Sequence, residues 1–515
     1  MWVSIVIFTF FTTLVVIAWK FLNWVWLTPK RMEKILRKQG LKGNSYKFLF
    51  GDAKETSIMY KESYSKPIGV NDDIGPRVMP FISKTIKTYG ENSFMWVGPR
   101  PCVFIMDAEL MKVVMNKYNS FHKPFKISNP IFRRLIGGLI RFEGEKWSKN
   151  RKKLNPLFHL DRLKDMVGTM QKQCEEILEE WSNMIPKDGS PGMIDVFPYL
   201  PDYTGSVVSH TLFTTPFQGI VKRTFNIISE LTLLANQAQP FSVPGEQFLP
   251  TKKYRRANEI ENEVRVTFTS MINERLDKRE AGEINREPDL FDMFLDELND
   301  VHNSRDRAMA IQEIIQQCKL FFIAGYETTS NLVAWTIIML AVHQDWQDRA
   351  RKEIFEVLGK KDKIHGDDLG HLKVLNLIIN EVLRLYPPSV EVTRVVEEET
   401  QFGEYCLPKG AMVMLPVILL HRNPRIWGKD VLEFKPERFA EGVLKAANGH
   451  AAFIPFGWGQ RNCIGANLAV WETKVFVISL LRKFAFELSP EYAHGPLVSL
   501  NMQPQYGAPL VLRKL

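Results

Sequence analysis

The stretch PFGWGQRNCIGANLA, residues 455–469, places one cysteine, Cys463, after a turn rich in glycine. Gly457 and Gly459 permit the positive φ angles that a sharp turn needs. Beyond the cysteine, apolar residues recur at helical spacing, so Cys463 is predicted at or just before a helix N-terminus. Unpaired N–H groups and the helix dipole favour an anion there, and we expect the thiol to ionise easily. A thiolate so placed is a nucleophile, a redox partner or a metal ligand.

A second stretch, residues 309–343, is largely apolar, lacks proline and as one helix extends for about 50 Å through the interior. Its middle carries small or polar residues, namely Gly325, Glu327, Thr328 and Thr329. A carboxyl beside a hydroxyl is costly inside an apolar helix unless both groups are partnered. One interpretation is a satisfied polar pair or a kink, since helical threonine often bonds back to the preceding turn. The other is a proton relay beside a small groove in which a ligand touches the backbone.

Two further segments combine charged residues with apolar helical faces. A helix predicted over residues 371–386 has Glu381 and Arg384 on one face, among apolar neighbours that indicate burial. The segment EGEKWSKNRKKLNPLF puts Trp147 and Arg151 on one side of a helix and three lysines on the other. It is either an amphipathic surface helix or one that turns its tryptophan and arginine toward an internal anion. In the second case an acidic partner would meet Lys149, Lys152 and Lys153.

Charge and cysteine content exclude several function classes. The formal charge of +9 suits an acidic partner or an anionic membrane surface, but no dense basic run with stacking aromatics indicates nucleic acid. Five cysteines, with no CxxC pair, argue against a disulfide framework and a structural zinc site. Neither GxGxxG nor a P-loop is present, so nucleotide is not expected to bind this chain directly.

The N-terminus is predicted to be a membrane anchor rather than a cleaved signal peptide, because no basic region precedes its apolar run and no small-residue cleavage site follows. Residues 2–19 carry no charge, and as a helix they extend for about 27 Å, close to the hydrocarbon thickness of a bilayer. Basic residues after the run place the remainder in the cytosol. We expect Thr28-Pro29 to end the helix. The predicted organisation is a transmembrane anchor at 1–27, a basic linker at 28–60 and a catalytic domain at 61–515.

The remainder is predicted to be mainly helical. Strand-like runs are short and too few for a doubly wound sheet; they occur at residues 93–106, 390–396 and 411–417. No repeat, low-complexity tract or long Gly/Ser linker divides the chain, which favours one large catalytic domain over several small ones.

These motifs together resemble the cytochrome P-450 family. The family's haem-ligand signature FxxGxRxCxG is matched by Phe456, Gly459, Arg461, Cys463 and Gly465. Its oxygen-binding motif is matched by residues 324–329, its ExxR pair by Glu381 and Arg384, its PERF element by residues 436–439, and its WxxxR by Trp147 and Arg151. All occur in family order, and with the anchor the resemblance covers essentially the whole chain.

The usual proline-rich hinge is absent, and TPKRMEKILRKQGLKGNSYKFLFGD stands in its place. This variant resembles the plant microsomal clan that contains secologanin synthase, saponin triterpenoid oxidases and hormone-inactivating hydroxylases. The resemblance implies a mainly α cytochrome P-450 fold with minor β-sheets, preceded by one N-terminal transmembrane helix. It also implies a single-pass protein of the endoplasmic reticulum membrane whose catalytic domain is cytosolic.

For the site, the resemblance implies haem b with Cys463 as the axial thiolate and O2 as co-substrate. Phe456 would shield the sulfur, and the haem propionates would be bound by Trp147, Arg151, Arg394 and Arg461. Glu327 and Thr328 would be the catalytic residues that deliver protons during oxygen activation. A buried structural network on the proximal side would comprise Glu381, Arg384 and Arg438.

The implied reaction inserts one oxygen atom from O2 into a small apolar substrate. Electrons would come from NADPH through a membrane-bound cytochrome P-450 reductase, which would meet the three lysines near Arg151. The clan points to a plant terpenoid, with a triterpenoid ahead of iridoids and gibberellin-like acids. The pocket is expected to be apolar, lined by Phe125, Ala324, Val390 and Val392, with Ser389 or Gln505 to orient the substrate.

Two alternative functions use the same fold. One is an O2-independent haem-thiolate isomerase or dehydratase, and such relatives typically lose the acid–threonine pair that this chain keeps as Glu327 and Thr328. The other is a catalytically silent membrane haem protein, against which the same pair argues. Reductase-dependent turnover would separate these cases.

Overall fold

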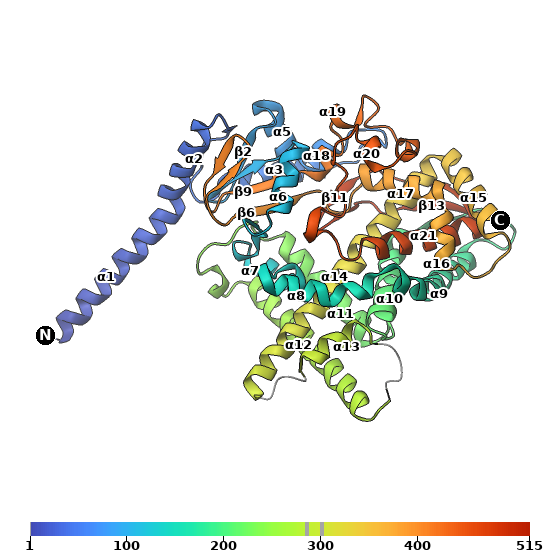
Figure 1. Cartoon of the computed structure of the whole chain (residues 1–515), viewed down its shortest axis with the longest axis horizontal. Helices are drawn as coiled ribbons and strands as arrows, with labels where there is room; N and C mark the ends of the chain where they lie inside the picture. Colours follow the sequence, from blue (N-terminus) through green and yellow to red (C-terminus); the bar gives the residue numbers. More distant parts are fainter. Residues whose placement is uncertain (1, 284–287, 299–302) are drawn as a thin grey trace.

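The computed structural model describes residues 2–283, 288–298 and 303–515. One long N-terminal helix projects from a body in which helices surround small sheets (Figure 1). The longer helices of the body are α5 (Pro80–Tyr89), α6 (Ala108–Asn116), α8 (Gly144–Leu154), α9 (Leu160–Met184), α10 (Leu200–Leu212), α11 (Ile220–Asn236), α12 (Lys252–Glu280), α14 (Ser304–Val342), α15 (Gln344–Leu358), α17 (Lys373–Leu385) and α21 (Ala466–Lys483). Helix therefore dominates, as the sequence predicts.

The projecting helix continues past the point where the sequence predicts its end. After α1 (Trp2–Leu22) the chain forms a π-helical turn, Asn23–Leu27, and continues as α2 (Thr28–Lys38). The prediction that Thr28-Pro29 ends the helix is therefore wrong. The π turn explains how the helix tolerates the proline, because such a bulge interrupts the regular hydrogen-bond ladder at the point where Pro29 has no N–H to donate.

The segment 28–60 is folded onto the body and is not a free linker. Met32 and Leu36 of α2 are buried in the core. Strand β1 (Lys42–Gly43) pairs in parallel with β2, and α3 (Ala53–Ser63) packs on α5. The sequence prediction missed this because the basic residues of α2 dominate its composition, while its apolar residues are few and fall on one face.

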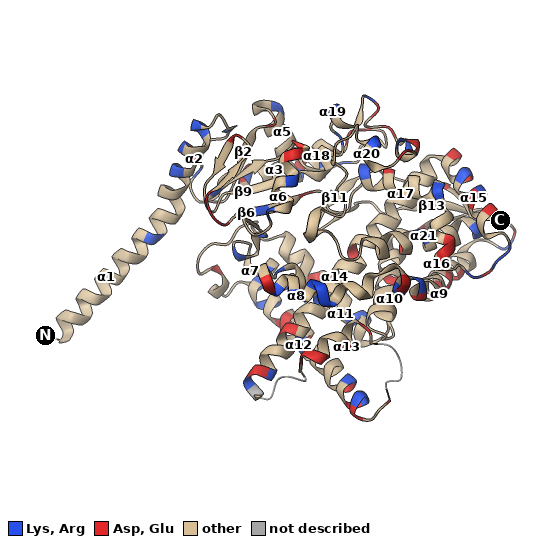
Figure 2. Ribbon diagram, viewed as in Figure 1, with Lys and Arg blue, Asp and Glu red and all other residues tan. Residues whose placement is uncertain are grey.

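Helix α1 is less buried and, for its length, carries fewer charged residues than the longer helices of the body. Residues 2–38 contain the one helical stretch, among the described residues, that is long and apolar enough to cross a membrane, and its apolar window is 0 % buried. Figure 2 shows α1 almost free of charge, with the basic residues of α2 next to the body. This composition agrees with the predicted single anchor.

The main sheet has six strands in the order β1-β2-β3-β9-β6-β4. Four of its strands fall within the strand-like runs of the sequence: β2 (Ser93–Val97), β3 (Arg100–Phe104), β6 (Val392–Val396) and β9 (Met412–Leu415). The two-residue strands β1 and β4 (Phe121–His122) lie outside those runs. Smaller sheets pair β5 (Gly192–Asp195) and β10 (Phe484–Leu488) with β13 (Pro509–Lys514), β7 (Thr400–Phe402) with β8 (Tyr405–Leu407), and β11 (Pro496–Val498) with β12 (Met502–Pro504). Arg394 therefore lies on β6, a strand that is paired with a neighbouring strand along each of its edges.

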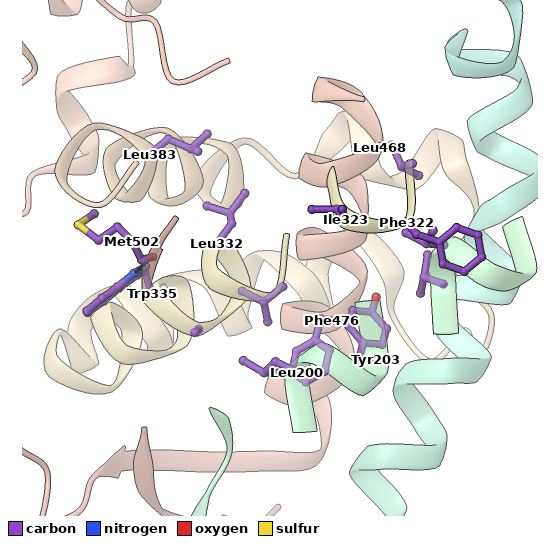
Figure 3. Packing of buried hydrophobic residues seen from close by; sticks show 14 of the residues in the cluster. Leu200, Tyr203, Phe322, Ile323, Leu332, Trp335, Leu383, Leu468, Phe476 and Met502 are labelled. Carbon is purple, nitrogen blue, oxygen red and sulfur yellow. Dashed lines mark hydrogen bonds between the residues drawn. The ribbon is translucent and has the colours of Figure 1, made fainter. Parts of the chain in front are cut away.

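Helix α14 runs through the interior and organises the core, packing against α10, α17 and α21. Figure 3 shows apolar side chains of these helices meeting around it, among them Leu332, Leu383 and Phe476. Trp335 of α14 stacks on Tyr386 with ring centroids 4.5 Å apart, and its indole N–H donates to the Met502 carbonyl at 3.1 Å. The long apolar stretch is thus confirmed as one buried helix, and it anchors the β11–β12 hairpin.

Candidate active site

A cavity of about 1110 Å³ opens between α14, the cysteine turn, the chain before β6 and the β11–β12 hairpin. Most residues on its wall are apolar, including Phe125 and Leu468. Ligand pockets usually measure roughly 300–1,000 Å³, so this space admits a large planar group together with a further molecule. Cys463 and Thr328 both lie on its wall.

The turn that carries the cysteine is closed by its own backbone. Gly457 and Gly459 have φ angles of 76° and 68°, which other residues rarely adopt. The Cys463 N–H donates to the Phe456 carbonyl at 2.8 Å. Helix α21 begins three residues later at Ala466. The thiol therefore lies just before a helix N-terminus, as predicted, and is exposed to the cavity.

The pKa of Cys463 departs from the expectation that this thiol ionises easily. Burial is the largest influence and raises the pKa of Cys463 above its usual value. The Gly465 N–H and the charges of Arg151 and Lys123 lower it, but by less. The helix N-terminus and the nearby cations favour the thiolate, but the cost of desolvating that charge is larger. A bound metal cation would supply the missing stabilisation.

Cationic side chains gather on the wall near the thiol: Lys123, Arg151, Arg394 and Arg461. Arg461 pairs with Glu143 at 2.8 Å and lies over the Trp147 ring, 4.5 Å from its centroid. Burial, and then the charge of Arg461, lower the pKa of Arg394 to about 10. One carboxylate thus faces four cations, and the excess positive charge indicates an anionic ligand.

Two members of this cluster depart from the expected pattern. Arg151 donates to the carbonyl and side chain of Asn462, at 2.8 and 3.1 Å, and so holds the cysteine turn directly. Lys123 was missed by the sequence prediction. Burial, and then Arg394 and Arg461, depress the pKa of Lys123. In the sequence, Lys123 is followed by Pro124 and Phe125, and this local pattern does not distinguish it from a surface lysine.

These features fit a haem. The wall combines a thiol that faces the cavity with a group of buried and half-buried cations and a large apolar surface. A porphyrin with an iron ion and two carboxylates would use all three, because the cations would pair with its carboxylates and the thiolate with its metal. Among the described residues no cluster of three or more His, Cys, Asp or Glu could hold a metal on its own.

Helix α14 carries the predicted acid and hydroxyl, of which Thr328 lines the cavity and Glu327 does not. The Thr328 hydroxyl donates to the Ala324 carbonyl at 2.6 Å, as helical threonine often does. Glu327 accepts a hydrogen bond from the Asn501 amide at 3.3 Å. Burial raises the pKa of Glu327 to about 7, while the Asn501 amide opposes that rise. The carboxyl can therefore both give and take a proton near neutral pH.

The glycine of this motif has a packing role. A Cβ on Gly325 would lie 2.6 Å from Cγ2 of Val208 in α10, so the glycine permits close packing of the two helices. Gly325 also lies on the cavity wall, together with Ala324 and Thr328, so the backbone of the motif borders the cavity and the hydroxyl is accessible from it.

The ExxR pair forms a fully buried ion pair, with Glu381 and Arg384 joined at 2.7 Å and both 0 % exposed. Arg384 also donates to the carbonyls of His421 and Val431, and Arg438 lies 3.6 Å from Glu381. His421 accepts the Ile454 N–H at 3.1 Å, immediately before the cysteine turn. The three predicted residues are thus brought together, and they brace the segment that leads to the thiol.

The predicted lining residues fall in two groups. Phe125, Ala324, Val390 and Val392 all lie on the cavity wall, as does Ser389. Gln505 does not: its side chain accepts from Arg77 at 2.7 Å and donates to the Tyr64 carbonyl at 2.9 Å. It therefore supports the β12 region and is unavailable to a ligand.

The three lysines of α8 are not equivalent. Lys149 and Lys152 are exposed. Lys153 is half-buried and pairs with Glu297 at 3.1 Å. The exposed part of this basic face therefore reduces to two lysines beside Arg151, the residue that holds the cysteine turn.

Comparisons with known proteins agree with this geometry. A family model described as Cytochrome P450 matches residues 76–504. Among curated proteins, 7-deoxyloganic acid hydroxylase of Catharanthus roseus is 43% identical over 99% of both chains. Secologanin synthase 1 of the same plant is 40% identical over 98% of this chain and 97% of its own. Echinocystic acid 23-monooxygenase of Saponaria officinalis is 40% identical over 97% of each.

A solved structure, the retinoic acid-bound cyanobacterial CYP120A1, superposes with a TM-score of 0.70. It covers 84% of this chain and 94% of its own at 23% identity, which supports the fold alone.

Proposed function

Because the chain belongs to the cytochrome P450 family and is a P450 monooxygenase, we propose that it hydroxylates a plant terpenoid, with Cys463 as the axial ligand of haem b. The observation that carries the site assignment is the meeting, in one cavity, of the thiol, the four cations and the Thr328 hydroxyl of α14. Glu327 lies behind this wall and is joined to it through Asn501. A thiolate-ligated haem supplies the activation of O2 and the insertion of one oxygen atom.

Different side chains would bind the haem carboxylates, hold the cysteine turn, exclude water and move protons. Arg394, Arg461 and Lys123 would pair with the haem carboxylates. The Trp147 ring would pack against the Arg461 guanidinium and fix its position. Arg151 would hold the turn at Asn462, so that the sulfur keeps a fixed position. Phe456 would exclude water from the sulfur. Glu327 and Thr328 would hold and move protons on the substrate side of the cavity.

A terpenoid substrate is supported by the cavity and by the relatives. The wall is mainly apolar, so a large rigid hydrocarbon gains about 25 cal/mol for each Å² that it buries, before association costs. Relatives covering the whole chain are named for iridoid and triterpenoid acids. A triterpenoid is our first candidate, ahead of iridoids and gibberellin-like acids.

Electron supply and location follow the same proposal. A membrane-bound reductase would deliver electrons from NADPH, and Lys149 and Lys152 would form part of its docking face. The unburied apolar helix α1 would hold the protein in the endoplasmic reticulum membrane, with its body in the cytosol.

The test is turnover by the holoenzyme with added reductase against triterpenoids, iridoids, gibberellins, fatty acids and phenylpropanoids. We expect an NADPH- and O2-dependent product that is heavier by one oxygen atom, formed from a terpenoid. Turnover confined to fatty acids and phenylpropanoids would contradict the terpenoid assignment. Product formation without O2 would favour the isomerase or dehydratase alternative instead.

A further inference from the structure

The cavity contains a carboxyl group that neither the cation cluster nor the acid–hydroxyl pair uses. Glu391 lies on the cavity wall, immediately before β6. Its Oε1 accepts a hydrogen bond from the Thr393 hydroxyl at 3.2 Å. Burial raises the pKa of Glu391, the Thr393 hydroxyl lowers it, and within the described part of the chain no cation is paired with it. The carboxyl therefore retains acceptor capacity that faces the cavity.

Tyr60 of α3 and Tyr64, which follows that helix, lie on the same wall. Thr56 of α3 also lines the cavity, but its hydroxyl oxygen is buried and has no hydrogen-bond partner among the described residues. Burial, followed by the charge of Glu391, raises the pKa of Tyr60, so the phenol and the carboxyl are electrostatic neighbours. Polar groups from two segments distant in sequence thus lie on the wall of one cavity, in addition to the cation cluster near the thiol.

Such a set suits one kind of ligand group. An ionised carboxylate only accepts hydrogen bonds, whereas threonine and tyrosine hydroxyls both donate and accept. An alcohol can donate to Glu391 and accept from a neighbouring hydroxyl, which satisfies every group. A ligand carboxylate would instead bring a second negative charge beside a desolvated one, and like charges repel strongly in such surroundings.

We propose that Glu391 and Tyr60 bind a hydroxyl group of the substrate, so that the enzyme selects a neutral alcohol over the corresponding carboxylic acid. The skeleton and the reaction rest on the proposed function, while this inference concerns the polar group that orients the skeleton. Glu391 acts as a specificity-determining residue: it accepts the alcohol proton in a hydrogen bond, and no covalent bond changes.

The experiment measures substrate-induced spin-state shifts of the holoenzyme with two matched pairs of compounds. Olean-12-en-28-ol and olean-12-en-28-oic acid share a triterpenoid skeleton without a further polar group and differ by a hydroxymethyl against a carboxyl group; 1-hexadecanol and hexadecanoic acid form the second pair. We expect the alcohol of each pair to bind roughly tenfold more tightly or better than the acid. Glu391→Gln keeps the size but loses the charge, and should reduce each ratio by roughly tenfold.

Controls separate this role from folding. Glu398→Gln, at an exposed carboxylate seven residues away in the chain, should leave both ratios unchanged. An unaltered reduced carbon monoxide spectrum of Glu391→Gln shows that the variant is folded. Tyr60→Phe should weaken binding of both alcohols and leave the acids unaffected.

The outcomes distinguish the two proposals. Equal ratios in wild type and Glu391→Gln, or binding of neither alcohol, would overturn the role of Glu391. If the ratios fall in the variant only for the hexadecyl pair, and no triterpenoid binds, the triterpenoid assignment fails and the role of Glu391 stands. If triterpenoids are hydroxylated while Glu391→Gln leaves the binding ratios unchanged, the proposed function is supported and the role of Glu391 is overturned.

Discussion

At the scale of single residues, the thiol of Cys463 is the group on which the site depends. It faces the cavity, and the Gly465 N–H and the charge of Arg151 both lower its pKa. Cys463→Ser should abolish the absorption band of the reduced carbon monoxide complex at roughly 450 nm, because a serine hydroxyl does not replace the thiolate. Retention of that band in the purified variant would rule out Cys463 as the ligand. Cys406→Ser, at a partly exposed thiol in the β8 strand, is the matched control and should keep the band.

Glu327 should make the stability of the protein depend on pH. Its pKa is raised by burial from 4.5 to about 7, so the folded state prefers the protonated acid. The stability that this preference contributes is fully present below pH 4.5 and is lost as the pH rises through about 7. Relative to wild type, Glu327→Gln should therefore gain stability across this window, on the order of 3 kcal/mol in total.

Infrared difference spectra give a direct measure of the same group. A protonated carboxyl band that disappears near neutral pH in wild type should be missing in Glu327→Gln. Asn501→Ala removes the amide that lowers this pKa, so the band should persist to higher pH. A band in Glu327→Gln identical to that of wild type would assign the titration to another carboxyl.

At the scale of elements, α1 and α2 form one continuous helix with two different roles. The apolar window of α1 is unburied, whereas Val25, Met32 and Leu36 beyond it are in the core. Removal of residues 2–22 should release the protein from membranes and leave its carbon monoxide spectrum and thermal unfolding unchanged. Removal of residues 2–38 should also destabilise the body, by about 3 kcal/mol or more, because several buried apolar side chains are lost. Equal unfolding temperatures for the two truncations would contradict this division.

At the scale of the whole molecule, α8 connects the surface to the thiol. Arg151 of α8 holds the residue before Cys463, and Lys149 and Lys152 are exposed on the same helix. The double substitution Lys149→Glu with Lys152→Glu should raise the reductase concentration needed for half-maximal reduction and flatten its salt dependence, since charge pairing is screened by salt. Stopped-flow reduction at several ionic strengths measures both effects.

The matched control reverses the same number of charges elsewhere. Lys360 and Lys363 are exposed in the connection between α15 and α16 (Gly366–His371), far from α8 in Figure 1. Their substitution by glutamate should leave reduction unchanged. If both double variants slow the reaction equally, net charge rather than a docking face controls it.

The sequence by itself determined the chemistry of this protein and most of its long elements. The cysteine turn, the buried helix α14 and the Glu381–Arg384 pair follow from local spacing, because glycine conformations and helical periodicity are properties of neighbouring residues. The unburied apolar helix α1 follows from length and composition. Ends of elements were less certain, as the helix that continues through Pro29 shows, since a π turn accommodates the missing N–H.

Tertiary structure alone decided how distant residues combine. Lys123 joins the cation cluster, Asn501 meets Glu327, and Glu391 meets the hydroxyls of α3, although each pair of segments is far apart in the chain. The same applies to the raised pKa values of Cys463 and Glu327, whose largest cause is burial. Burial and through-space charge depend on which segments the fold packs together, and no local sequence pattern encodes that packing.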